Sequence, residues 1–306
     1  MNVLVLTPDG VGSTVLQRIC TLALHLDGQD VVNCHELTNG LHLIRSKVYK
    51  DFALGYTQSL DQITKILDQS TGILVSRLAK YHIDNRNDRM QEQLTFYNYL
   101  RSFNQKVLVC RRKNLFEYAM SWSIRDKSKV LNVYQKKDRE AVRNVGSVDV
   151  EYFMKKCQDY VDYDNWIHEH FKDFDVVYYE DFAVDPDSKI KEIFGIDQVF
   201  ARAFGEPLAD IFKKEYLVSK RKIDLSNKQK FSPLLKYKQT MMSLEKKAIL
   251  PLGASAPIKN TTLKDKKEIV SNYTECRDRF MEFSRRHNWI DNTIVDYDFW
   301  NGVEIK

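Results

Sequence analysis

Glycines and hydroxyl side chains that could bind an anion gather in one short run near the N-terminus, Gly10-Val11-Gly12-Ser13-Thr14. The apolar run 3–6 precedes it, and apolar residues at helical spacing follow it from 13 to 26. A strand, a glycine turn and a helix in this order aim free backbone N–H groups at one point, where the helix dipole also favours negative charge. The glycines allow the backbone to approach a bulky anion. The run therefore predicts a phosphate- or sulfate-binding loop, with an ordinary β–α turn as the alternative.

Basic residues and a hydroxyl follow a second predicted strand, and the family resemblance described below implies that they bind a phosphate. The run Arg111-Arg112-Lys113 directly follows the apolar residues 107–110, and Ser121 lies eight residues after the lysine, inside a helix predicted over 115–124. An arginine can hold a phosphate through two parallel hydrogen bonds, whereas a lysine supplies a point charge. Any of the three cations could fill this role. The alternative is a solvated basic turn at the end of a strand.

Two side chains are candidates for a general base, a role that the family resemblance described below implies for them. His82 follows the predicted strand 72–76, and an imidazole can accept a proton near neutral pH. Glu36 follows the predicted strand 31–34, and a carboxylate that is partly removed from water can have a pKa raised enough to accept a proton. The sequence does not rank one above the other. Hydrogen bonds that only shape a cleft are the alternative role for both.

Short apolar runs alternate with helical patterns and so predict the elements that position these residues. Strands are expected at 3–6, 31–34, 72–76, 107–110 and 175–179, and helices at 13–26, 59–69, 88–103, 115–124, 147–171 and 264–287. Residues 213–247 are rich in Lys and Arg and have little clear period. The alternation predicts an α/β fold with a central parallel sheet flanked by helices on both faces. Ligands of such sheets bind beyond the C-terminal ends of the strands.

Composition narrows the class of protein. A hydrophobic content of 43% is typical of a globular chain, and the net charge of +5 suits an anionic ligand but is too small to indicate nucleic acid. No targeting segment and no apolar stretch of about 18 residues is recognised, which predicts a cytoplasmic protein. The five cysteines are widely spaced and odd in number, so we expect reduced core residues. His168 and His170 stand two apart on a predicted helix and cannot chelate a metal together.

Four segments resemble motifs of the sulfotransferases, cytosolic and bacterial, that use 3′-phosphoadenosine 5′-phosphosulfate. Residues 8–17 resemble their 5′-phosphosulfate loop, and 107–122 resemble the strand and helix that bind the 3′-phosphate. Residues 76–82 resemble the segment whose histidine is the general base of those enzymes. Residues 175–196 resemble their Tyr-Glu-Asp and Asp-Pro segment, which marks the fold. The resemblance implies a P-loop-like sulfotransferase fold in one domain. Its core would be 1–196, with a helical, basic elaboration at 197–306 that the resemblance hardly reaches.

The resemblance also implies roles for the candidate residues. The loop 10–14 would hold the 5′-phosphosulfate, and the basic run with Ser121 would hold the 3′-phosphate. His82 would be the base and Lys80 would contact the sulfate, while Glu36 lies where some bacterial relatives place a catalytic glutamate. The implied reaction moves a sulfuryl group to a hydroxyl or amine of a small molecule, glycan or peptide and releases adenosine 3′,5′-bisphosphate. No metal, nucleic acid or membrane is implied.

The loop departs from the family pattern at one important place. The family has a lysine or arginine inside the loop, where this chain has Gly10 next to Asp9. Arg18, Lys80 or a lysine from the C-terminal third could replace that charge. A nucleotide or polynucleotide kinase is an alternative function, although the lysine of the Walker A loop is also missing. A binding protein that kept the fold without catalysis is another.

Overall fold

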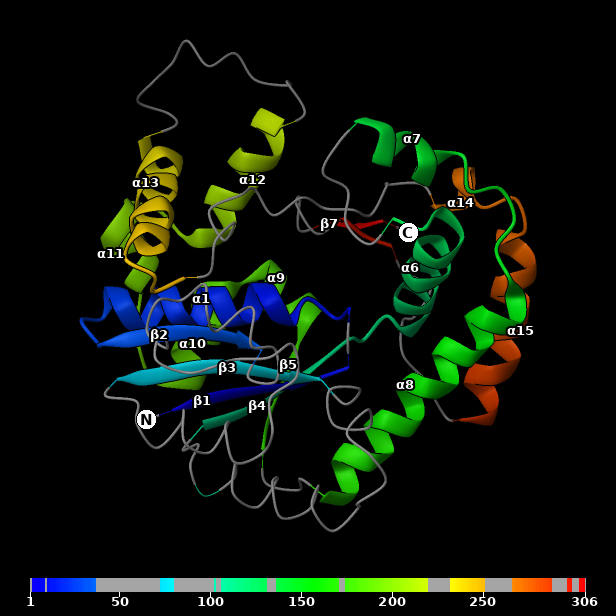
Figure 1. Ribbon diagram of the computed structural model, residues 1–306, viewed down its shortest axis with the longest axis horizontal. Coiled ribbons are helices and arrows are strands. Elements are labelled where there is room, and N and C mark those ends of the chain that lie inside the picture. The colour runs from blue at the N-terminus through cyan, green and yellow to red at the C-terminus, as the bar shows by residue number, and fades with distance from the viewer. Residues whose placement is uncertain are drawn as a thin grey trace, which may run out of the picture. The chain divides into compact units, whose positions relative to one another are not determined.

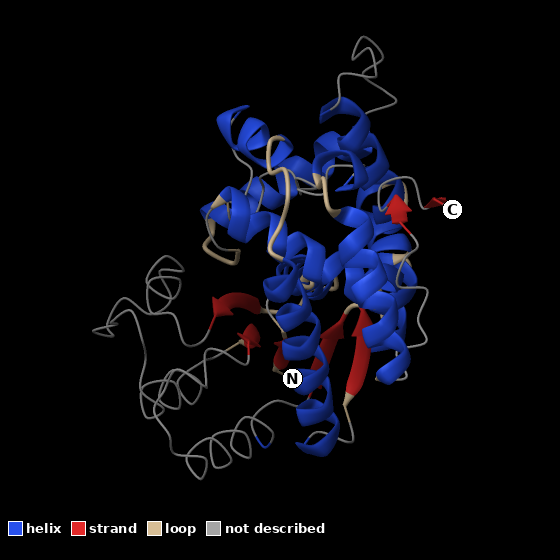
Figure 2. Ribbon diagram, turned by 90° about the vertical axis from the view of Figure 1, so that its right-hand side faces the viewer, coloured by secondary structure: helices blue, strands red, loops and turns tan. Residues whose placement is uncertain are grey.

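The computed structural model describes residues 2–8, 10–36, 72–79, 102, 106–130, 136–170, 174–219, 232–250, 266–287, 296–298 and 303–305. The chain divides into two compact units. The first, here called the sheet unit, contains 1–111, 173–257 and 299–301, and the second, the helical unit, contains 112–172, 258–298 and 302–306. Figures 1 and 2 show the helices and strands of both. The single domain expected from the sequence stays a prediction.

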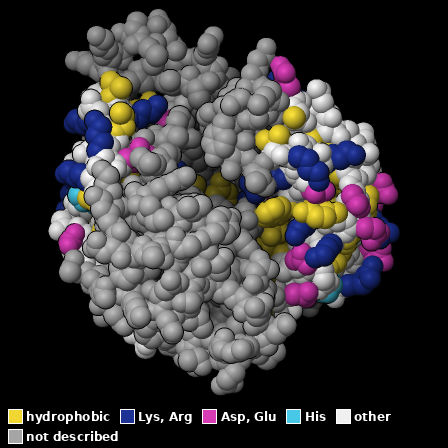
Figure 3. Space-filling view, viewed as in Figure 1, with side chains coloured by type: hydrophobic (Ala, Val, Ile, Leu, Met, Phe, Trp, Pro, Cys, Tyr) yellow, Lys and Arg dark blue, Asp and Glu magenta, His cyan; other side chains and the backbone are white. Residues whose placement is uncertain are grey.

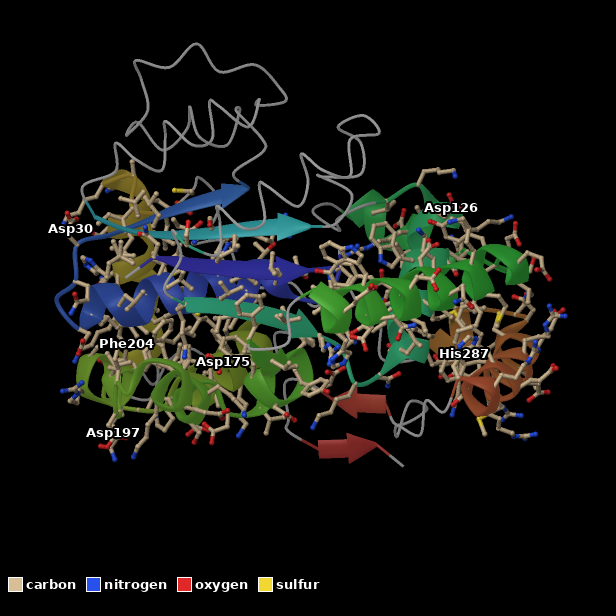
Figure 4. All side chains as sticks on the ribbon, turned by 90° about the horizontal axis from the view of Figure 1, so that it is seen from below. Asp30, Asp126, Asp175, Asp197, Phe204 and His287 are labelled. Carbon is tan, nitrogen blue, oxygen red and sulfur yellow. The ribbon has the colours of Figure 1, made fainter. Side chains whose placement is uncertain are left out.

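The sheet unit is built on a five-stranded parallel sheet, which confirms the predicted α/β class. Its strands are β1 (Val3–Thr7), β2 (Val31–Glu36), β3 (Ile73–Ala79), β4 (Lys106–Arg111) and β5 (Asp175–Tyr178), in the order β2-β3-β1-β4-β5. All residues of the central strand β1 are buried, as its continuous apolar run predicts. Figure 4 shows Asp175 at the start of β5, where its carboxylate pairs with the Lys106 ammonium of β4.

Six described helices belong to the sheet unit: α1 (Ser13–Leu26), α9 (Tyr179–Val184), α10 (Pro186–Phe194), α11 (Val199–Phe204), α12 (Leu208–Ser219) and α13 (Ser232–Lys246). Helix α1 packs on β1, β2 and β3, and α9, α10 and α11 pack on α1. Figure 4 labels Phe204, a buried residue at the end of α11. The helices predicted over 59–69 and 88–103 lie outside the described residues, and the expected cover of both sheet faces stays a prediction.

The basic stretch 213–247, expected to have little regular pattern, includes the whole of α13. The buried residues of α13 are Leu234, Tyr237, Met241 and Leu244, which repeat at three- and four-residue steps. Lysines between them obscure this stripe in the sequence, but a helix with one apolar face needs no more than these positions. The helix α13 therefore packs against α11 and α12 through one face.

Buried polar contacts fix the rotation of α1 on the sheet. The Gln17 side-chain amide donates to the Val75 carbonyl at 3.1 Å, and the Asn33 amide of β2 donates to the Thr21 hydroxyl at 2.9 Å. The Thr21 hydroxyl in turn donates to the Gln17 carbonyl at 2.8 Å. Because buried polar groups are costly without partners, these bonds favour one register of α1 over its rotated alternatives. They thereby set the direction of its first turn.

The helical unit contains α6 (Leu115–Ser128), α7 (Lys136–Arg143), α8 (Val150–His170), α14 (Lys266–Ile269), α15 (Tyr273–Arg286) and the antiparallel pair β6 (Asp296–Asp298) and β7 (Val303–Ile305). Its core contains four aromatic rings in edge-to-face contact. The Phe116 ring centroid lies 5.4 Å from that of Phe153, 5.2 Å from that of Tyr273 and 5.4 Å from that of Phe280. These rings join α6, α8 and α15.

The helix predicted over 264–287 is two helices, with a break at Val270–Asn272. Val270 forms a β-bridge with Gly146, and the Asn272 side chain binds the Val148 backbone at both ends, accepting from its N–H at 2.9 Å and donating to its carbonyl at 3.0 Å. These contacts hold 266–287 against the segment before α8. An uninterrupted amphipathic pattern could not show the break, because its cause lies more than a hundred residues away in the sequence.

The sequence predicted that the cysteines are reduced and lie in the core. All five cysteines are free and buried, which confirms the prediction of reduced core residues.

Charges of both signs are mixed on the surface of the helical unit (Figure 3), with exposed ion pairs such as Lys155–Asp159 and Arg279–Glu151. Of the helices in the described ranges, none combines the length and the apolar composition that a bilayer crossing needs.

Candidate anion-binding site

The glycine run forms a turn between β1 and α1, as predicted. Gly10 and Gly12 both have left-handed backbone conformations, with φ of 85° and 84°. Gly12 is the N-cap of α1, and no described side chain caps this end or places an acid in its first turn. The first backbone N–H groups of a helix lack partners within the helix. This end of α1 therefore presents donors and a partial positive charge.

An aromatic ring lies directly against Gly12. A methyl group at this position would lie 2.0 Å from Cδ2 of Tyr179, the first residue of α9. No side chain fits there, and the left-handed φ would strain any residue with a Cβ. Gly12 is thus required both by its conformation and by the close approach of the Tyr179 ring. The segment around Tyr179 therefore contributes to the packing of the loop.

A buried arginine brings positive charge to the same turn. The Arg77 guanidinium of β3 donates to the Ser13 hydroxyl at 3.3 Å and to the Thr14 hydroxyl at 3.1 Å. Arg77 is 7% exposed, so its charge acts in a medium less polar than water. Together with the helix dipole it favours an anion at the start of α1. Sequence reasoning missed Arg77 as a site residue; the available signal was a charged residue near the end of an otherwise apolar strand.

The turn lies at the place where parallel sheets bind ligands. Strands β1 and β4 are neighbours with parallel register, but the chain leaves β1 toward β2 and leaves β4 toward β5 on the opposite side. Ligands of α/β sheets bind at such a change of direction. The Cys110 thiol of β4 donates to the Val11 carbonyl at 3.8 Å, which joins the loop to the end of that strand. Arg111, the next residue, is buried at the end of β4.

The remaining residues of the basic run belong to the helical unit. The Tyr160 hydroxyl of α8 holds the Arg112 backbone, accepting from its N–H at 2.7 Å and donating to its carbonyl at 3.2 Å. Two residues later, the Asn114 side chain caps α6 by accepting from the Glu117 N–H at 2.9 Å. Both ends of Lys113 are therefore attached to an ordered helix start, and Ser121 follows in the second turn of α6.

A buried lysine occupies the surroundings of Ser121. The Lys266 ammonium of α14 donates to the Ser121 hydroxyl at 2.9 Å and to the Glu117 carbonyl at 3.2 Å, and it pairs with the Glu117 carboxylate. Lys266 is 6% exposed. Lys266 belongs to the charge run 264–268, whose composition predicts a solvated helix face, and this prediction is wrong for Lys266. Its neighbour Lys267 is exposed, as expected.

The other candidates differ in how far they are described. Lys80 and His82 lie outside the described residues. Glu36 ends β2, where its backbone is the register partner of Arg77, but its side chain is outside the described part. Arg18 of α1 lies near Tyr237 of α13, because its positive charge lowers the pKa of the Tyr237 hydroxyl. Burial and the Glu215 carboxylate raise that pKa.

His168 and His170 lie two residues apart on α8, near its C-terminal end. His168 of α8 lies 3.8 Å from the Asp164 carboxylate, one turn away on the same helix. In the part of the chain that the structure describes, no three His, Cys, Asp or Glu side chains are grouped to hold a metal ion. The described chemistry is instead that of an anion site: helix N–H donors, two hydroxyls and a guanidinium. The sequence matches no protein-family model, and none of the curated proteins gives a significant match.

Proposed function

We propose that this chain is a sulfotransferase that moves a sulfuryl group from 3′-phosphoadenosine 5′-phosphosulfate to a hydroxyl or amine acceptor. The observation that carries the proposal is the Arg77 guanidinium on the hydroxyls of Ser13 and Thr14. The corresponding loop of the sulfotransferases contains a lysine or arginine, and this chain has Gly10 at that position. Arg77 supplies a positive charge to the same loop from a neighbouring strand, which supports the proposal although the loop itself has no lysine or arginine.

The cofactor would supply an activated sulfuryl group, and the residues of the chain would bind and orient it. The N–H groups of Gly12, Ser13 and Thr14 would hold the 5′-phosphosulfate. Arg77 would offset the charge that develops on the 5′-phosphate oxygen as its bond to sulfur breaks. The basic run 111–113 and Ser121 would hold the 3′-phosphate. As in phosphoryl transfer, most of the acceleration would come from positioning and preorganised charge.

The acceptor proton would pass to Glu36 or His82 while the new bond to sulfur forms. The register of the sheet supports Glu36, because its backbone pairs with Arg77 and both residues stand near the C-terminal edge. That edge is also where β1 leads into the glycine turn. Lys80, one residue past β3, would offset charge on the transferring oxygens. The proton leaves the acceptor, and adenosine 3′,5′-bisphosphate is the leaving group.

Calorimetry with adenosine 3′,5′-bisphosphate and adenosine 5′-monophosphate tests this function. The wild-type chain should bind the bisphosphate more tightly than the monophosphate. Arg77→Met should weaken both ligands by about 10- to 100-fold, because each carries the 5′-phosphate and charge-assisted hydrogen bonds contribute about 1.5–3 kcal/mol. Arg202→Met, an exposed site on α11 of the same unit, is the matched control and should change neither affinity. A wild-type chain that does not bind the bisphosphate refutes the proposal.

Turnover is tested separately. The chain is incubated with the phosphosulfate cofactor and a panel of phenols, sugars and amines, and formation of adenosine 3′,5′-bisphosphate is followed by chromatography. Acceptor-dependent formation that is lost in Arg77→Met supports transfer. Tight binding of the bisphosphate without any acceptor-dependent product would instead favour the binding protein that lacks catalysis.

A further inference from the structure

Lys266 is a buried cation of the helical unit, and its ammonium group contacts polar groups of α6. Its ammonium group has three hydrogen-bond donors. They are directed to the Ser121 hydroxyl, the Glu117 carbonyl and the Glu117 carboxylate. The Glu117 side chain is itself 12% exposed, so both charges of the pair are shielded from water. The contact joins residues 145 positions apart in the chain.

The position of Lys266 is set by structure outside the contact itself. The bridge between Gly146 and Val270, and the two bonds between Asn272 and Val148, hold the end of α14 on the unit. Lys266 starts the same short helix, and its backbone carbonyl accepts from the Val270 N–H at 2.9 Å. A lysine fixed in this way loses little further freedom when it holds a hydroxyl. The site is thus organised before any ligand arrives.

The Lys266 contact determines what the Ser121 hydroxyl can do. A hydroxyl has one proton to donate and two lone pairs that accept. Because the Ser121 oxygen accepts from an ammonium group, its own proton stays available for another acceptor, and the charge on the lysine makes that proton a stronger donor. Pairing with Glu117 removes the repulsion that a lone carboxylate would exert on an anion. This hydroxyl is therefore prepared for an anionic oxygen.

We propose that Lys266 and Glu117 form a positioning pair that prepares the Ser121 hydroxyl to donate to the 3′-phosphate of the nucleotide. The proposal rests on the proposed function and adds two residues that no sequence motif indicated. The pair sets the preference for an adenosine with a 3′-phosphate over one without it. The pair acts on the 3′-phosphate alone.

The test is the ratio of the affinities for adenosine 3′,5′-bisphosphate and adenosine 5′-monophosphate, measured by calorimetry. Lys266→Met should lower this ratio by about 10-fold or more, the scale of a charge-assisted hydrogen bond, and leave the monophosphate affinity unchanged. Lys267→Met, at the exposed neighbour on α14, is the control and should keep the wild-type ratio. Ser121→Ala should lower the ratio similarly, and adding Lys266→Met to it should cause little further loss, because the lysine acts through the hydroxyl.

A second variant protects the test against misfolding, since Lys266→Met leaves the shielded Glu117 carboxylate without its cation. Glu117→Gln combined with Lys266→Met removes both charges and keeps the shapes of the side chains. Its ratio should stay low. A return to the wild-type ratio would mean that the lysine only neutralises Glu117, and this would overturn the proposal. So would a wild-type ratio in Lys266→Met. A wild-type chain with no preference for the bisphosphate would instead overturn the proposed function, and this inference with it.

Discussion

Replacing Gly12 by alanine tests the geometry of the loop without any ligand. The substitution adds a methyl group 2.0 Å from Cδ2 of Tyr179 at a residue with φ of 84°. The left-handed conformation costs about 1–2 kcal/mol for a residue with a Cβ. Crowding of a packed ring costs about 1–3 kcal/mol more. We therefore expect Gly12→Ala to lower the free energy of unfolding by about 2–5 kcal/mol.

A matched glycine separates the two contributions. Gly28, just after α1, has φ of 85°, and nothing lies within 4 Å of a methyl group added there. Gly28→Ala should therefore show the conformational cost alone, about 1–2 kcal/mol. Thermal melts by circular dichroism measure both variants, and about 2 kcal/mol corresponds to a fall of about 4 °C or more in Tm. Equal costs at the two glycines would refute the close approach of the Tyr179 ring.

A double-mutant cycle assigns the extra cost to the ring. In a Tyr179→Ala background, the crowding contribution of Gly12→Ala should disappear, while the conformational contribution should stay. The coupling energy between the two substitutions should then equal the difference between the Gly12 and Gly28 variants. If Gly12→Ala costs as much with alanine at 179 as with tyrosine, the strain does not arise from this contact.

Two further predictions concern the stability of the sheet unit. Asp185 caps α10 by accepting from the Ser188 N–H at 3.0 Å, so Asp185→Ala should lower the free energy of unfolding by about 1 kcal/mol in urea titrations while Asp185→Asn keeps most of it. Burial raises the pKa of Glu215 above its ordinary value of 4.5, and Lys238 lowers it only in part. Between pH 4.5 and the raised pKa of Glu215 in the folded state, the folded state binds more protons than the unfolded state. The free energy of unfolding therefore falls as the pH rises through this interval. Glu215→Gln should raise Tm relative to wild type at pH 7 more than at pH 5, and an equal gain at both would contradict the burial effect.

The strands and the first helix could be predicted because their causes are local. A run of apolar residues such as 3–6 fits only a strand buried on both faces, and the period after Ser13 requires a helix with one apolar side. The glycine turn was also predictable, since strand, glycines and hydroxyls follow without a gap. In the sequence these features fix the end of the sheet where a ligand binds. They do not identify the side chains that arrive from other strands.

Arg77 illustrates that limit. Its distance in sequence from Thr14 is 63 residues, and only the pairing of β3 beside β1 brings the two together. The missing cation of the loop was therefore sought in Arg18 and Lys80, although Arg77 lies in the same recognised segment, 76–82, as Lys80. The strand order decides the matter, because a residue near the C-terminal end of β3 stands next to the turn that follows β1. Strand order is a property of the whole sheet and cannot be read from one segment.

The Lys266 contact shows why the C-terminal third resisted interpretation. Lys264 to Glu268 has the composition of a solvated helix face, and all five of its residues are charged. Composition cannot separate the one lysine that is 6% exposed from its exposed neighbour, because their sequence surroundings are nearly the same. Lys266 and Lys267 differ because successive residues of a helix point in different directions, and Lys266 is the one that meets α6. A functional role in this third of the chain therefore depends on where the segment docks, and a residue-pair test such as Glu117 with Lys266 can reveal it where a motif search cannot.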